Sequence, residues 1–202
     1  MDIPLSENGQ PAWAVATLFP CQGQWSEHDY LSLPTNHLIE LSDGRLEVLA
    51  MPTERHQLVA LWLYRKLDDW VKANQLGIAL AAPMRMRTSE GRFRDPDVLF
   101  MRGEHSSRRH NAYWDGADFV AEVVSEDDPD RDRVVKRQEY AKVGIPEYWI
   151  LDPRDQSIAV LVLDPGQSEY REAMVVSGQE IARSIHLPGF EVVTAEAFDH
   201  KH

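Results

Sequence analysis

The sequence predicts a mixed α/β domain in which a central β-sheet is accompanied by few helices. Two segments have the three- and four-residue apolar spacing of amphipathic helices, and short apolar runs typical of strands surround them. One run, residues 119–124, is almost entirely apolar, as expected for a central strand covered on both faces. With 202 residues, 43% of them hydrophobic, the chain can bury a core without disulfides or structural zinc.

The first part of the chain predicts a polar arm and then a hairpin. We expect the arm at residues 1–24, a single domain at residues 25–195 and a short tail at residues 196–202. The hairpin is expected at residues 37–50, where two strand-like runs flank Asp43-Gly44, a strong turn signal.

A long amphipathic helix follows the hairpin. Thr53 is the expected N-cap, and Glu54 meets the positive end of the helix dipole. Asn74 and Gly77 end the helix after Ala73. Its buried stripe is expected to contain Val59, Leu63, Leu67 and Trp70.

Extended runs and a second helix complete the predicted order. The second helix is expected from Asp130 to Val143, with Gly144 as its stop. Short strands and turns are expected over residues 170–193. The extended runs before them lie at residues 78–87, 97–101, 119–124, 148–151 and 158–163.

The charge of the chain limits the kind of partner it can have. A formal net charge of −12 argues against a protein that coats nucleic acid, because such proteins usually carry a basic field. A brief, metal-assisted contact with DNA stays open. Residues 84–110 hold seven arginines against four acidic residues, and this strip is either a phosphate-facing edge or an ordinary solvated surface.

The cysteine content and the N-terminal hydropathy indicate a cytoplasmic protein without a membrane partner. Cys21 is the one cysteine, so no intrachain disulfide can form. The longest early apolar run, residues 13–19, is far shorter than the ~20 residues needed to span a bilayer.

Two carboxylates break the apolar pattern of neighbouring strands. Side chains alternate along a strand, so Glu122 shares a face with Val120 and Val124, where an unpaired charge is costly. Asp97 shares a face with Leu99 in the preceding strand-like run. The alternatives are a structural buried glutamate at position 122 and a solvated turn residue at position 97.

Lys136 breaks the pattern of the second helix. Asp132, Lys136, Tyr140 and Val143 fall within a narrow arc of that helix. Lys136 therefore either points at the sheet or snorkels, with its stem packed and its amine in solvent.

Two carboxylates on adjacent strands, followed by a lysine on a helix, suit phosphodiester chemistry. The carboxylates would hold a hard divalent cation such as Mg²⁺ through oxygen. The lysine would supply positive charge for the attacking water and the developing phosphorane. Zn²⁺ is disfavoured because the eight histidines show no metal-ligand spacing.

These residues resemble a known superfamily. Pro96-Asp97 followed by Glu122, 25 positions later, is similar to the motif of the PD-(D/E)XK restriction-endonuclease-like superfamily. An ordered set of further motifs resembles the bacterial Uma-type family of nucleases over about residues 25–195. The matching segments are residues 37–44, 55–57, 95–98, 121–125, 136–140 and 144–152.

The resemblance implies a restriction-endonuclease-like core, with an added N-terminal hairpin and C-terminal strands, that hydrolyses DNA with Mg²⁺ or with Mn²⁺ as a substitute. It makes Asp97 and Glu122 metal ligands and the Val123 carbonyl a third. The motif's lysine is expected at position 124, which is a valine here, so Lys136 would take its role.

Three further residues match the family pattern as supplementary members of the site. Glu40 is either an extra acid near the metal or an ordinary hairpin charge. For His56, a hydrogen-bonded core histidine is favoured over a ligand. Tyr140 lies on the arc of Lys136.

Two functions are therefore open: a metal-dependent endodeoxyribonuclease, or a non-catalytic nuclease-fold module that binds DNA or protein. Asp97 and Glu122 favour the first, whereas the net charge and the absent lysine at position 124 favour the second. Six tryptophans and the apolar late strands predict a homodimer.

Overall fold

The computed structural model describes residues 19–34, 37–125 and 128–199. The chain divides into two compact units, one of residues 1–49 and 90–92, the other of residues 50–89 and 93–202. Most of the predicted arm lies outside the described residues, and the single domain at residues 25–195 stays a prediction.

The first unit contains α2 (Glu27–Ser32) and the predicted hairpin of β1 (Ile39–Ser42) and β2 (Arg45–Val48). Ser42 pairs with Arg45, so the loop between the strands is the two-residue Asp43-Gly44. Both loop residues have positive φ, 49° and 76°, which matches the turn that Asp-Gly favours. The hairpin prediction is confirmed, whereas α2 was not predicted.

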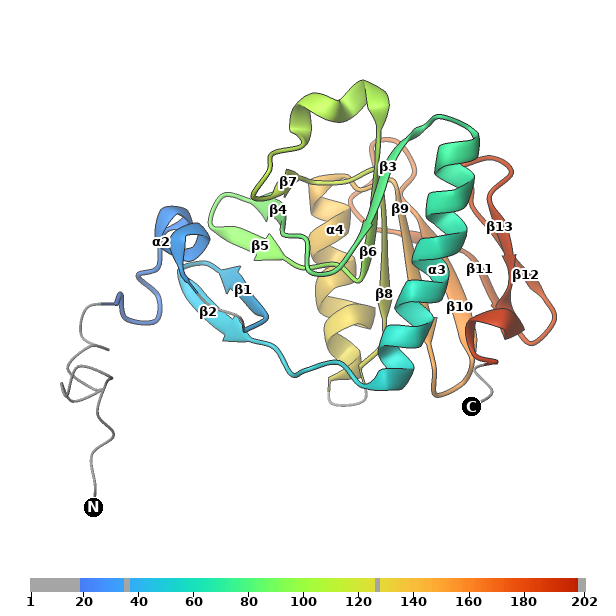
Figure 1. The fold of residues 1–202 in the computed structure, drawn as a ribbon, viewed down its shortest axis with the longest axis horizontal. Helices are drawn as coiled ribbons and strands as arrows, with labels where there is room; N and C mark the ends of the chain where they lie inside the picture. Colours follow the sequence, from blue (N-terminus) through green and yellow to red (C-terminus); the bar gives the residue numbers. More distant parts are fainter. Residues whose placement is uncertain (1–18, 35–36, 126–127, 200–202) are drawn as a thin grey trace, which may run out of the picture. The chain divides into compact units, whose positions relative to one another are not determined.

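The second unit is built around a six-stranded mixed sheet (Figure 1). The first three strands along the chain form an antiparallel meander, and the third pairs in parallel with the fourth. This arrangement confirms the predicted mixed α/β class. In spatial order the strands are β11 (Arg171–Ser177), β10 (Ser157–Val162), β9 (Glu147–Asp152), β8 (Phe119–Val123), β6 (Val98–Arg102) and β3 (Gly77–Ala81).

One face of this sheet is covered by α3 (Glu54–Ala73) (Figure 1). The Thr53 side chain caps the helix by accepting the His56 N–H at 3.2 Å, as the sequence predicted. The stripe of Val59, Leu63, Leu67 and Val71 packs against the sheet. Trp70 is only partly buried, at the edge of the same core.

The other face is covered by a helical segment that begins as a π-helical turn, Arg131–Lys136, and continues as α4 (Arg137–Val143). The sequence predicted one regular helix here, and Gly144 ends it as predicted, with φ 81°. The π turn is the difference, and such turns occur frequently at functional sites. Tyr140 and Ala141 pack here against the sheet face that carries Val120, Leu99 and Tyr148.

The predicted strand at residues 78–87 is two strands. β3 ends at Ala81, and β4 (Met86–Ser89) pairs in parallel with β7 (Trp114–Asp115) instead. Pro83 lies between β3 and β4, and a proline has no N–H to donate to a strand ladder. The remaining elements are β5 (Arg92–Arg94), η1 (Gly103–Arg108), β12 (Ile181–Arg183), β13 (Glu191–Val193) and η3 (Thr194–Ala197). In the described part of the chain, no helix is both long and apolar enough to cross a membrane.

The end of β9 is held by the buried carboxylate of Asp152. Arg133 donates a hydrogen bond to it, and Arg154 donates through both its backbone N–H, at 2.9 Å, and its Nη2, at 2.6 Å. Burial alone would raise the pKa of Asp152, but these hydrogen bonds outweigh burial and hold the pKa at about 2. A carboxyl with a lowered pKa stabilises the fold above its ordinary pKa of 3.8.

We therefore expect Asp152→Asn to lower the free energy of unfolding by about 1–2 kcal/mol at pH 7, because both arginines are solvent-screened. The difference should shrink as the pH falls from 3.8 towards 2. Urea unfolding at several pH values measures it. The exposed Asp155→Asn is the matched control, with an expected change under about 0.5 kcal/mol. Equal effects of the two variants would contradict this prediction.

Candidate active site

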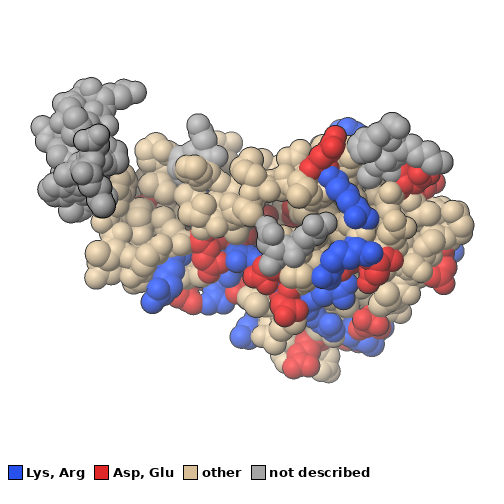
Figure 2. Space-filling model, turned by 90° about the horizontal axis from the view of Figure 1, so that it is seen from below, with Lys and Arg blue, Asp and Glu red and all other residues tan. Residues whose placement is uncertain are grey.

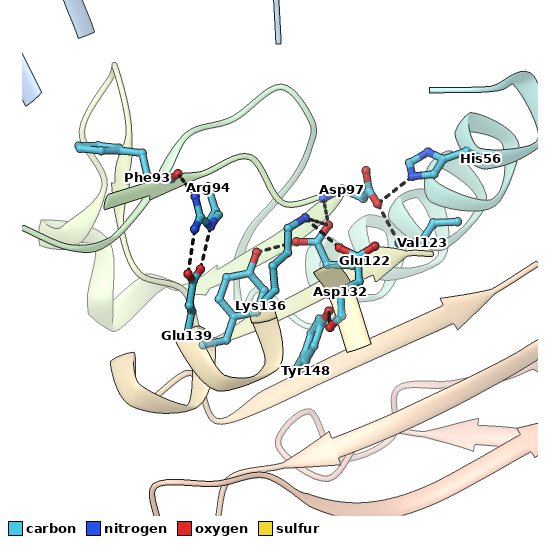
Figure 3. Close-up of polar contacts among 11 residues, drawn as sticks. His56, Phe93, Arg94, Asp97, Glu122, Val123, Asp132, Lys136, Glu139 and Tyr148 are labelled. Carbon is cyan, nitrogen blue, oxygen red and sulfur yellow. Dashed lines mark hydrogen bonds and ion pairs between the residues drawn. The ribbon is translucent and has the colours of Figure 1, made fainter. Parts of the chain in front are cut away.

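Asp97 and Glu122 lie next to each other at one end of the six-stranded sheet. Asp97 directly precedes β6, and the antiparallel pairing of Val98 with Ala121 brings it beside Glu122 on β8. The Val123 N–H donates to Asp97 Oδ2 at 2.8 Å, and the Asp97 N–H contacts Glu122 Oε2 at 3.4 Å (Figure 3). The structure thus brings together the two carboxylates that the sequence singled out.

Lys136 points at this pair from the π turn. Its Nζ lies 3.0 Å from Glu122 Oε2 and 3.0 Å from Asp132 Oδ1, and all three side chains are buried (Figure 3). Of the two alternatives for Lys136, the one directed at the sheet is confirmed. Asp132 was placed on the correct face by the sequence pattern, but its contact with Lys136 was not predicted.

Two tyrosines support the buried charges. The Tyr140 hydroxyl donates to Glu122 Oε1 at 2.5 Å, and the role of Tyr140 as a supplementary site residue stays a prediction. The Tyr148 hydroxyl on β9 donates to the Asp132 backbone carbonyl at 3.0 Å. Burial and the charge of Glu122 raise the pKa of Tyr148, so its hydroxyl remains a proton donor.

His56, in the first turn of α3, meets Asp97 from the other side. Its Nε2 lies 3.2 Å from Asp97 Oδ2. Burial lowers the pKa of His56, but the hydrogen bond to Asp97 and its charge outweigh burial, and the pKa is raised. His56 is therefore the hydrogen-bonded histidine that the sequence favoured, and its bond is to a candidate metal ligand.

The electrostatics of the cluster centre on Glu122. Burial raises its pKa well above the ordinary value, and the charges of Asp97 and Asp132 add to this rise against the opposing Lys136 and Tyr140. Lys136 contacts Glu122 and Asp132, and His56 contacts Asp97. Because the raised pKa of Glu122 reflects a disfavoured charged form, a further cation beside it would stabilise that form.

The donor set fits a hard divalent cation. Among residues 19–34, 37–125 and 128–199, no three or more His, Cys, Asp or Glu side chains form a group that could hold a metal ion. Mg²⁺, however, is commonly bound by one or two carboxylates and keeps several waters. The Asp97 carboxylate makes its hydrogen bond and its ion pair with described residues through Oδ2. Its Oδ1 makes neither kind of contact with the described residues. Asp97 and Glu122 thus offer the one or two carboxylates that such an ion takes; the Val123 carbonyl as a third ligand stays a prediction.

Glu40 is the remaining residue that the sequence singled out for the site. Glu40 lies in β1, in the first unit, and its side chain is buried; its role as a supplementary acid stays a prediction.

Arg94, on β5, makes a buried two-pronged ion pair with Glu139, at 2.7 and 2.8 Å, which ties β5 to α4 beside Tyr140. No pattern in the sequence indicated that pair.

Comparisons with known proteins identify the family and the fold of the chain. The model of the Uma2 family, described as "Putative restriction endonuclease", matches residues 27–196. No curated protein matches the chain. A crystal structure titled as a putative nuclease belonging to DUF820, from Anabaena variabilis, superposes with a TM-score of 0.69 at 18% sequence identity and covers 85% of this chain and 96% of its own. That likeness shows a shared fold. Because the family model spans most of the sequence, the chain belongs to the Uma2 family.

Proposed function

We propose that the chain is a metal-dependent endonuclease that hydrolyses phosphodiester bonds in DNA. The observation that carries this proposal is the contact of Lys136 Nζ with Glu122 Oε2 at 3.0 Å, beside Asp97. A lysine buried against two carboxylates supplies what the strand position 124 lacks, since Val124 packs in the apolar core. Family and fold both support a nuclease-like function.

Asp97, Glu122 and the Val123 carbonyl would hold Mg²⁺, and Mn²⁺ is expected to substitute. When bound, the ion would polarise the phosphodiester and lower the pKa of a water molecule.

The side chains around the carboxylates hold them in place. His56 and the Val123 N–H fix the Asp97 carboxylate from two directions. Tyr140 and Lys136 fix the two oxygens of Glu122. Lys136 also places a positive charge where negative charge develops on the phosphoryl oxygens, which is worth most in a site that excludes water.

The buried polar cluster favours this function over a non-catalytic module. A domain that only binds DNA or protein has no use for Glu122, Asp132 and Lys136 buried together, because burying charges is costly. The net charge of −12 weighs against tight binding of DNA and leaves open only a brief, metal-assisted contact.

The test is cleavage of supercoiled plasmid DNA by the purified chain with Mg²⁺, with Mn²⁺ and with EDTA. We expect nicked and linear products with either metal and none with EDTA. Intact plasmid in both metals, across several DNA sequences and single-stranded DNA, would favour the non-catalytic module.

The homodimer is also a proposal. Two copies would place two sites on one duplex, which would benefit cleavage of both strands. Four of the six tryptophans are accounted for within the chain, since Trp149 and Trp114 are buried and Trp62 and Trp70 pack against the core. Sedimentation at micromolar concentration decides between monomer and dimer.

A further inference from the structure

Three arginines from three different elements converge on the end of β9. Arg133, from the π turn, and Arg154, from the turn after β9, both donate to the carboxylate of Asp152. Arg55, in the first turn of α3, donates through Nη2 to the backbone carbonyl of Pro153. We call Arg55, Arg133 and Arg154 the arginine cluster.

Arg55, Arg133 and Asp152 each lie next to the candidate site, either in the sequence or through the pairing of two strands. Arg55 directly precedes His56, and Arg133 directly follows Asp132. Asp152 follows Leu151, whose carbonyl accepts the Val124 N–H at 2.9 Å in the parallel pair of β9 and β8. In Figure 1, β8 ends at the lower side of the molecule, and Figure 2 shows that side. Basic and acidic side chains lie close together on this surface.

The guanidinium groups of Arg133 and Arg154 are anchored on a buried carboxylate, while much of each side chain is exposed to solvent. The Asp152 side chain is 1% exposed, whereas those of Arg133 and Arg154 are 41% and 42% exposed. Within the described residues, Arg133 makes its contacts through Nη2, and so does Arg55. Each guanidinium has five N–H donors, so, as far as the described residues go, the Nε and Nη1 groups of both can donate to a ligand.

The ligand chemistry that fits is a phosphate diester. Arginine forks match the geometry of phosphate oxygens, and fixing the guanidinium beforehand reduces the entropy lost on binding. The acidic groups near the cluster, Asp155 at 3.6 Å from Arg133 and Asp130 near Arg154, are exposed, so water screens them.

We propose that the arginine cluster binds a DNA backbone phosphate next to the one that is cleaved; this inference rests on the proposed function. The basic strip at residues 84–110 does not occupy this place. Its Arg102 ends β6, about 17 Å along the strand from Asp97 at the other end. Its Arg87 pairs with Asp115 at 2.6 Å, and Arg108 contacts Asp118 at 3.6 Å.

The experiment measures binding of a fluorescein-labelled duplex of mixed sequence by anisotropy, with Ca²⁺ in place of Mg²⁺ and at several salt concentrations. The test variant carries Arg55→Gln and Arg133→Gln. The control variant carries Arg171→Gln and Arg183→Gln, which remove the same charge from exposed ion pairs on β11 and β12. We expect the test variant to bind roughly 10- to 100-fold more weakly, with the slope of log K against log salt reduced by about two. The control should stay within about threefold.

Arg133 also supports Asp152, so the test variant could lose stability, and Arg55→Gln alone resolves this. Arg55 donates to a backbone carbonyl, and its loss should weaken binding roughly three- to tenfold while the melting temperature is unchanged. Binding equal to that of the control variant, or no binding of DNA by the unmutated chain, would overturn the inference. If DNA binding depends on the arginine cluster but the unmutated chain does not cleave DNA in Mg²⁺, only the proposed hydrolysis is overturned. If the unmutated chain cleaves DNA but the cluster variants bind it normally, only the inference is overturned.

Discussion

Replacing Glu122 by Gln is expected to lower Mg²⁺-dependent DNA cleavage by about 10³-fold or more. The substitution keeps the shape of the side chain and removes the charge that would hold the metal, and a bound metal supplies several kcal/mol of transition-state stabilisation. Initial rates of plasmid nicking measure the effect. Glu172→Gln, an exposed position on β11, is the matched control and should leave the rate unchanged. Cleavage by the Glu122→Gln variant at the unmutated rate would exclude Glu122 as a metal ligand.

The same variant has a second readout that does not depend on activity. Because the pKa of Glu122 is raised in the folded chain, the folded state binds this proton more tightly than the unfolded state does. Without metal, the stability of the unmutated chain should therefore fall as the pH rises above the ordinary glutamate pKa of 4.5. Glu122→Gln should flatten this part of the profile. A profile that is the same for both proteins in EDTA would show that Glu122 carries no unfavourable charge.

Replacing Lys136 by Met is expected to lower cleavage by about 10²–10³-fold, the usual loss for one electrostatic contact to a transition state. It should also lower the free energy of unfolding by about 3–5 kcal/mol at neutral pH, because Glu122 and Asp132 lose the cation that lies 3.0 Å from each. Plasmid nicking and urea unfolding in EDTA measure the two effects.

The matched control is Lys142→Met, an exposed position in α4, which should change neither quantity appreciably. Reading the cleavage rate well below the melting temperature of the variant separates lost chemistry from lost folding. An unchanged cleavage rate in Lys136→Met would exclude Lys136 as the functional replacement for the lysine that position 124 lacks.

The part of the site that could be predicted from the sequence lies on regular elements. Alternation along β8 places Glu122 on a buried face, and the same rule applies to Asp97 beside β6, so two charges on apolar strands were recognisable. The helical arc predicted that Lys136 and Tyr140 share a face. Residues 131–136 form a π turn and not a regular helix, but Lys136 and Asp132 are still adjacent on its surface, as the helical arc predicted.

The rest could not be predicted, since it depends on contacts between distant segments. The helical arc placed Asp132 on the face of Lys136, but its burial and its contact with the Lys136 amine depend on how the π turn packs against Glu122 and Tyr148. The arginine cluster depends on the parallel pairing of β8 with β9, which brings Asp152 to the edge where α3 begins. The sequence directed attention to the arginines at residues 84–110 because they are close in the chain.

We propose that Asp97 and Glu122 bind one divalent cation. The most direct measurement is the anomalous scattering of a crystal of the chain soaked in Mn²⁺. We predict one Mn²⁺ bound by both carboxylates, with ligand distances of roughly 2.0–2.6 Å. Mn²⁺ sites elsewhere on the chain, with none at Asp97 and Glu122, would contradict the claim.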